Sequence, residues 1–162
     1  AFRAPEWNEQ SSIDVLNDTI QSLQSNQKDL TKKIESQEAL LVNEIFEQYK
    51  SAFTTINDIE FLGVQLPLSN ADHLKKLALQ FNSLHTTGVV ILTAQANGKA
   101  NVALSISESL VNSKNWQAPA IIKEKIAPLI KGGGGGQKTL ATAGGQDTSQ
   151  LEKVIEVVKA IL

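Results

Sequence analysis

The apolar positions of the first third of the chain recur at alternating steps of three and four residues. This spacing is the heptad seam of an amphipathic helix. Because residues 8–57 contain no Gly or Pro, we expect one long helix there. The seam needs a partner, which is another copy of the chain, a further helix or the globular part of the chain itself. The seam positions are Ile13, Leu16, Ile20, Leu23, Gln27, Leu30 and Ile34.

Strand patterns replace the heptads in the rest of the chain. Residues 60–66 predict a strand, and residues 88–94 form a nearly continuous apolar run typical of a central strand covered on both faces. Asn97-Gly98 predicts a hairpin turn. Apolar and small residues alternate over 102–106, which predicts the return strand of that hairpin.

Helical spacing returns between and after these strands. Capping boxes at 69–72 and 149–152 are each expected to begin a helix, residues 108–112 form a short helical segment, and Pro119 begins a further helix. The expected buried faces are Leu74, Leu77, Ala78, Phe81 and Leu84, then Ile121, Ile122, Ile126, Leu129 and Ile130, and finally Leu151, Val154, Ile155, Val158 and Leu162.

The order of these elements predicts an α+β fold with two parts. Residues 1–58 form a helical, coiled-coil linker or oligomerisation segment, and residues 59–162 form a small mixed-sheet domain with flanking helices. The chain contains no Met, so we expect Ala1 not to be a native start and the chain to be a piece of a longer protein.

Glycines at Gly132, Gly133, Gly134, Gly135 and Gly136, followed by Gly144 and Gly145, interrupt the pattern near the end of the chain. An apolar helix precedes this stretch and a second apolar helix follows it. Since both helices need the same core, we expect an ordered loop at the edge of the domain rather than a flexible linker.

Charge is divided unevenly between the two parts. Residues 1–58 carry a net charge of −5 and residues 59–162 a net charge of +3. Five lysines and one glutamate occupy 114–138, beside the glycines. This bias indicates either an anionic partner or a solvated lysine face.

Nucleotide-binding motifs do not fit the glycine run. A phosphate-binding P-loop needs a glycine where Gln137 stands, and it needs a strand before the run rather than a helix. The dinucleotide pattern G-x-G-x-x-G also fails in every register.

Residues for catalysis are scarce. The chain has no Cys, and its two histidines, His73 and His85, are twelve residues apart on one predicted helix, where we interpret both as ordinary helix residues. We therefore predict no catalytic and no metal-binding residues. No apolar run reaches the length of a membrane span, so we expect no membrane contact, and the absence of Cys is compatible with the cytoplasm.

Binding is the remaining function. Consecutive glycines expose backbone N–H and C=O groups, and Lys131 and Lys138 beside them attract phosphate, which suits recognition of a folded RNA by its shape. A bulky residue at Gly134 is expected to block such an approach. With two Trp and one Tyr, the chain offers few platforms on which single-stranded bases could stack.

The glycine run, followed by Ala141-Thr142-Ala143-Gly144-Gly145 and a final helix, closely resembles the end of alanyl-tRNA synthetases. The strand over 88–92, the Asn-Gly-Lys turn and the return strand are also similar to that family, whose C-terminal domain is of the DHHA1 type. This sequence departs from the family at Lys131, where a glycine is usual, at Thr142, where a glutamine is usual, and in lacking the proline after the run.

The resemblance implies a fragment that binds the elbow of alanine-accepting tRNA. It would support aminoacylation and editing by the other domains of the parent synthetase, which hold the ATP, magnesium and zinc sites, with no cofactor in the fragment. The implied contacts are Gly132–Gly136, Gly144, Gly145, Lys131 and Lys138. Two alternatives stay open. In the first, the chain would be a structural dimerisation module with Ile13–Ile34 as its seam. In the second, it would be the substrate-binding domain of a DHH-type phosphoesterase, a class in which a Gly-Gly-Gly-His motif is typical.

Overall fold

The structure is a computed structural model that describes residues 9–162, except for the side chains of residues 9–12 and 39. Its first element is helix α1, Glu9–Tyr49, and this confirms the long N-terminal helix. The predicted first residue, Asn8, lies outside the described residues. The chain divides into two compact units, residues 1–37 and residues 38–162. The domain boundary predicted between residues 58 and 59 stays a prediction.

The end of the long helix lies earlier than expected. After α1 ends at Tyr49, strand β1, Thr54–Ile56, pairs antiparallel with β2, Ile59–Leu66. Asn57 and Asp58 between them both have positive φ, as a tight hairpin turn requires. A window free of Gly and Pro therefore did not have to be helical, because β-branched residues at 54–56 found a strand partner.

Six strands form one mixed sheet in the order β1-β2-β3-β4-β6-β5. Strands β2 and β3 are parallel, and every other pair is antiparallel. The Asn97-Gly98 turn is confirmed, since both residues have positive φ and join two long paired strands. The remaining strands are β3 (Gly88–Ala96), β4 (Lys99–Ile106), β5 (Gly132–Gln137) and β6 (Leu140–Gly145).

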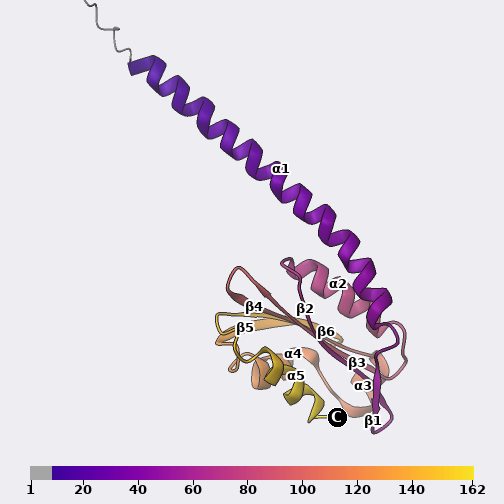
Figure 1. The fold of residues 1–162 in the computed structure, drawn as a ribbon. Helices are drawn as coiled ribbons and strands as arrows, with labels where there is room; N and C mark the ends of the chain where they lie inside the picture. Colours follow the sequence, from indigo (N-terminus) through magenta and orange to yellow (C-terminus); the bar gives the residue numbers. More distant parts are fainter. Residues whose placement is uncertain (1–8) are drawn as a thin grey trace, which may run out of the picture. The chain divides into compact units, whose positions relative to one another are not determined.

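Helices cover both faces of the sheet (Figure 1). Helix α2, Ala71–Asn82, covers one face, and α4, Ala118–Ile121, covers the other together with α5, Leu151–Lys159. Helix α3, Glu108–Lys114, follows β4. The helix expected to begin at Pro119 begins one residue earlier and continues as a π-helical turn, η1, over Ile122–Ile126. The α+β fold with a mixed sheet is confirmed.

The apolar run at the centre of β3, residues 89–92, is buried on both faces of the sheet. Val89 and Ile91 belong to the core under α4 and α5, whereas Val90 and Leu92 belong to the core under α2. All four side chains are buried. Because successive side chains of a strand point to opposite faces, burial on both sides explains why four apolar residues follow one another here.

The C-terminal part of α1, within residues 38–162, completes the α2 core. Val42 and Ile45 are buried there, and the ring of Phe46 stacks on that of Phe81 with 5.2 Å between centroids. Phe81 itself is fully buried on the predicted apolar face of α2. Leu84, which we expected on the same face, is 45% exposed because α2 ends at Asn82.

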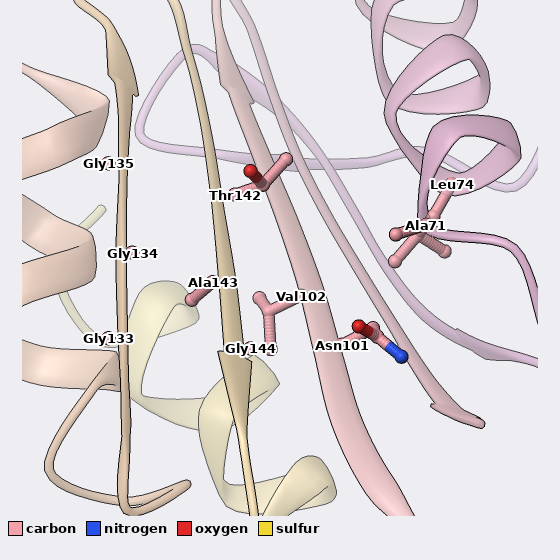
Figure 2. Close-up of a pocket in the computed structure, with 10 residues that line it drawn as sticks. All are labelled: Ala71, Leu74, Asn101, Val102, Gly133, Gly134, Gly135, Thr142, Ala143 and Gly144. Atoms are coloured by element: carbon pink, nitrogen blue, oxygen red, sulfur yellow. The ribbon is translucent and has the colours of Figure 1, made fainter. Parts of the chain in front are cut away.

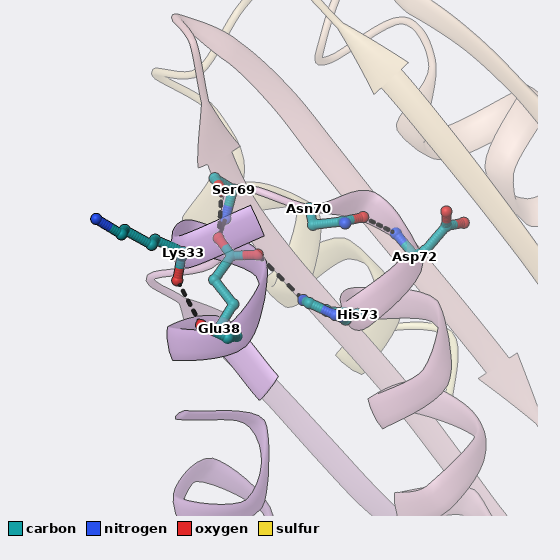
Figure 3. A network of polar contacts seen from close by, with 7 residues as sticks. Lys33, Glu38, Ser69, Asn70, Asp72 and His73 are labelled. Carbon is teal, nitrogen blue, oxygen red and sulfur yellow. Dashed lines mark hydrogen bonds and ion pairs between the residues drawn. The ribbon is translucent and has the colours of Figure 1, made fainter. Parts of the chain in front are cut away.

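A buried carboxylate explains why the predicted capping box at 69–72 does not form. Glu38 accepts hydrogen bonds from the Ser69 backbone N–H, at 2.8 Å, and from the Ser69 hydroxyl. His73 donates to its other oxygen across 3.0 Å, as Figure 3 shows. Asn70 caps α2 instead, accepting from the Asp72 N–H at 2.8 Å.

The second predicted capping box is also absent, because Ser149 has another partner. Its hydroxyl donates to Asp147 across 2.6 Å, and α5 begins after Gln150 without a side-chain cap. The expected apolar face of α5 is nevertheless present. Leu151, Val154 and Val158 are buried in the core.

Candidate nucleic-acid interface

The glycine-rich stretch is a β-hairpin at the edge of the sheet, not the loop that the sequence predicts. Strand β5 pairs antiparallel with β6 over its whole length, from Gly132 opposite Gly145 to Gln137 opposite Leu140. Glycine is among the residues least favoured in strands, so local sequence gave no strand signal here. The stretch is a strand because its backbone pairs with that of β6.

Backbone hydrogen bonds hold this hairpin at both ends. At the turn, the Lys138 carbonyl accepts from the Ala118 N–H at 2.9 Å, and the Thr139 carbonyl accepts from Ile106 at 2.8 Å. At the open end, the Gly132 N–H donates to Ala127 at 3.0 Å and the Asp147 N–H donates to Ile130 at 2.9 Å. The stretch is therefore an ordered part of the domain and not a flexible linker.

Four of the seven glycines have no room for a side chain. A Cβ added at Gly132, Gly134 or Gly136 would overlap a carbonyl oxygen of β6, and one at Gly145 would overlap that of Ile130. These atoms belong to the backbone and cannot rotate away. Glycine at these positions is thus required by the close approach of neighbouring chain segments.

The other three glycines have free space beside them. A Cβ at Gly133 or Gly135 would meet no atom within 4 Å, and one at Gly144 would only touch the Ala100 carbonyl at 4.0 Å. Gly133 lies opposite Gly144 in the register, and Gly135 lies opposite Thr142. Alternation along the strands places these open positions on the α2 face of the sheet.

Over these open glycines lies a hollow of about 310 Å³, shown in Figure 2. It is lined by Ala71 and Leu74 of α2, by Asn101 and Val102 of β4, by residues 142–144 of β6 and by residues 133–135 of β5. Its floor is mostly backbone. A partner resting there could approach the main chain closely without meeting side chains of β5.

Two further hollows, of about 350 Å³ each, continue this one along β5. The first has the lining residues Asn101 and Gly144 in common with the central hollow, and it extends to Lys99 and Lys131. The second meets the central hollow at Gly135 and Thr142 and extends to Lys75 and Leu79. We call the three hollows together the glycine groove.

The two lysines predicted from sequence lie at opposite ends of the hairpin. Lys131 precedes β5 with a positive φ, is 75% exposed and forms an ion pair with Asp147 across 2.9 Å. Hydrogen bonds from the Ser149 hydroxyl and from Lys131 lower the pKa of Asp147 to about 2, so this carboxylate remains ionised. Lys138 is exposed in the turn between β5 and β6. Contact of either lysine with RNA stays a prediction.

Sequence reasoning missed three polar residues of the groove. Lys75 comes from α2, while Lys99 and Asn101 come from β4, and all three lie more than 30 residues before the glycine run. The sequence singled out Lys99 only as part of the Asn-Gly-Lys turn, and it gave no signal for Lys75 or Asn101. Their approach to the glycines depends on the strand order, which places β6 beside β4.

The histidines have structural surroundings in this fold. His73 is bonded to Glu38, and the His85 ring packs on Phe53 with 4.2 Å between centroids. Among the side chains that the structure describes, no group of three or more His, Asp or Glu is placed to hold a metal ion. The described helices also include none that is both long and apolar enough to cross a membrane.

Comparison with known families matches residues 58–162 to the DHHA1 domain. The chain is 30% identical to an alanine–tRNA ligase of Cytophaga hutchinsonii, with 88% of this chain and 18% of the ligase covered. It is 32% identical to alanine–tRNA ligases of Trichodesmium erythraeum and Lactobacillus acidophilus, over 89% and 90% of the chain. It spans 16–18% of the length of these curated relatives.

Solved structures share the fold. The C-Ala domain from Aquifex aeolicus alanyl-tRNA synthetase matches with a TM-score of 0.62 and 23% identity, covering 68% of this chain and 96% of that domain. A DHH-domain structure from the s1p family of ribosomal proteins matches with a TM-score of 0.50 and 14% identity, over 81% of this chain and 32% of that one. Since the DHHA1 match spans more than half of its residues, the chain belongs to the DHHA1 domain family, and it is similar in sequence to alanine–tRNA ligases over most of its length.

Proposed function

We propose that this chain binds the elbow of alanine-accepting tRNA as a module of a longer, cytoplasmic alanine–tRNA ligase. In that role it supports aminoacylation and editing by domains that carry the ATP, magnesium and zinc sites. The glycine groove is the observation that carries the proposal. It offers exposed backbone on a paired sheet, with lysines at its two ends, in a chain whose relatives are named alanine–tRNA ligases.

The surface suits a folded RNA better than a single strand. Recognition of structured RNA relies on shape, phosphates and 2′-hydroxyls, for which a surface free of side chains and flanking lysines are sufficient. Single-strand binders instead stack bases on aromatic side chains. Among the residues that line the glycine groove there is no aromatic side chain.

Removal of Lys138 tests the electrostatic part of this proposal. We expect Lys138→Ala to weaken binding of an alanine tRNA transcript roughly fivefold at 0.15 M salt, because one phosphate contact releases about one counterion. The slope of log K against log salt should fall by about 1. Lys131→Ala should have a smaller effect, since Asp147 already neutralises that ammonium group. Fluorescence anisotropy titrations at several salt concentrations measure both quantities.

The RNA specificity is tested in the same assay. A transcript with the elbow's loop–loop pairing disrupted should bind more weakly than intact tRNA, and a footprint should protect the elbow. Lys153→Ala on α5, which packs against the opposite face of the sheet, is the matched control and should bind as the unsubstituted chain does. Equal binding to a short unstructured RNA would contradict recognition of the elbow.

Dimerisation through α1 is a second candidate function, supported by the exposed seam. The side chains of Ile13, Leu16, Ile20, Leu23, Leu30 and Ile34 are 50–62% exposed. A solitary helix rarely leaves such a stripe in water. We expect the chain to sediment as a dimer at micromolar concentration and Leu16→Glu/Leu23→Glu to sediment as a monomer. A monomer at all concentrations of the unsubstituted chain contradicts this role while leaving tRNA binding unaffected.

A further inference from the structure

The three hollows of the glycine groove lie one after another along β5. The hollow with Lys99 lies at Gly132, the central one at Gly133–Gly135, and the one with Lys75 at Gly135–Gln137. Neighbouring hollows share lining residues, so they adjoin one another along β5. At the rise of a β-strand, the six residues of β5 span ~17 Å. This length accommodates an extended chain and exceeds what a small ligand needs.

The charge of the groove is of one sign. Lys75, Lys99 and Lys131 line the outer hollows, and among the described residues no Asp or Glu lines any of the three. Asp147 neutralises Lys131. Lys75 and Lys99, one at each end, therefore carry the charge of the groove. A linear polyanion complements this arrangement.

The open glycines supply a separate argument. Glycine weakens a strand because the unfolded chain loses more conformational freedom on folding. At Gly134 this cost is unavoidable, but Gly133 and Gly135 have room for a side chain. Nothing inside the described part of the chain requires glycine at these two positions. A partner that lies directly on the backbone would require it.

The position of the groove distinguishes two classes of partner. A peptide that extended the sheet would lie beside β5 in the plane of the sheet, where its hydrogen-bonding groups point. The central hollow instead lies over the α2 face, where Ala71, Leu74 and Thr142 line it. Both the position and the charge favour a polyanion over an added strand.

We infer that one phosphodiester backbone lies lengthwise in the glycine groove, against Gly133 and Gly135, with Lys99 and Lys75 binding its phosphates at the two ends. This inference rests on the proposed tRNA binding and adds the residues and the direction of the contact. It assigns a binding role to Lys75 and Lys99. It also separates Gly133 and Gly135 from the glycines that the fold itself needs.

The test combines lysine and glycine substitutions in the full 162-residue chain. Lys75→Ala and Lys99→Ala should each weaken binding of an alanine tRNA transcript roughly fivefold at 0.15 M salt and lower the salt slope by about 1. Lys153→Ala and Lys159→Ala, exposed on α5, are the matched controls and should change neither value. Gly133→Ala should weaken binding while leaving the unfolding temperature unchanged or higher.

The outcomes separate this inference from the proposed function. If the unsubstituted chain does not bind tRNA, both fail. If it binds and the groove lysines behave like the α5 controls, the inference is overturned and the proposed function stands. Tight binding by Gly133→Ala also overturns it. Binding of an extended peptide that competes with tRNA and is insensitive to Lys75→Ala and Lys99→Ala would assign the site to strand addition instead.

Discussion

Gly134→Ala is expected to lower the free energy of unfolding by about 3 kcal/mol, whereas Gly133→Ala, one residue earlier, should raise it by about 0.5 kcal/mol. The added methyl group at Gly134 would overlap the Thr142 carbonyl oxygen and lie 2.8 Å from the Ala143 Cα. Both neighbours are fixed by the pairing of β5 with β6. At Gly133 the same methyl group meets no atom within 4 Å.

Urea unfolding followed by circular dichroism measures this difference directly. The two variants have identical composition, so any effect on the unfolded chain cancels in the comparison. Equal stability of the two variants would show that β5 tolerates side chains on both faces. The structure also changes how a bulky residue at Gly134 is interpreted, because loss of tRNA binding by such a variant would report damage to the sheet rather than a blocked approach.

The second large effect is expected at Glu38. Glu38→Ala should destabilise the fold by about 2 kcal/mol at pH 7, because it removes the charged acceptor of the hydrogen bonds from Ser69 and His73. Glu44→Ala, at an exposed position of the same helix, is the matched control and should change the stability little. Thermal unfolding of the three proteins at pH 7 provides the comparison.

Acid should remove the contribution of Glu38. Burial raises the pKa of this carboxyl, but the hydrogen bonds from Ser69 and His73 lower it more, and the net pKa lies below its ordinary value of 4.5. A carboxyl with a lowered folded pKa contributes its full stability above about pH 4.5 and loses it as the pH falls through the folded value. The stabilities of the unsubstituted chain and Glu38→Ala should therefore converge below pH 4.5. A difference that stays constant from pH 7 to pH 3 would contradict this.

Elements with strong local signals were predictable from the sequence. The hairpin at Asn97-Gly98 has the turn chemistry that its geometry needs, and the apolar run of β3 matches its burial on both faces. The predicted stripes of α2 and α5 include every buried residue of these helices, although Leu84, beyond the end of α2, is exposed. In each case the residues that decide the element are contiguous, so the physical cause is visible in a short window.

Helix starts and the end of α1 were less predictable because distant residues compete for the same groups. Ser69 had the sequence of a cap, but Glu38, 31 positions away, took its hydrogen bonds. Residues 54–56 contain no helix-breaking residue, yet they form a strand because they pair with β2. These choices compare a local interaction with a tertiary one, and only the folded chain contains both.

For the candidate site, the sequence by itself determined that seven glycines and two flanking lysines gather near the end of the chain and that no nucleotide motif fits them. Tertiary structure decided what they form. Pairing with β6 makes a strand of residues that have little strand propensity, and its register divides the glycines into those that the fold needs and those that face open space. The strand order brings Lys99 to the groove, and the packing of α2 on the sheet brings Lys75 there. Residues so far apart in sequence become neighbours only in the folded chain, because the burial of apolar surface between the sheet and its helices holds these elements together.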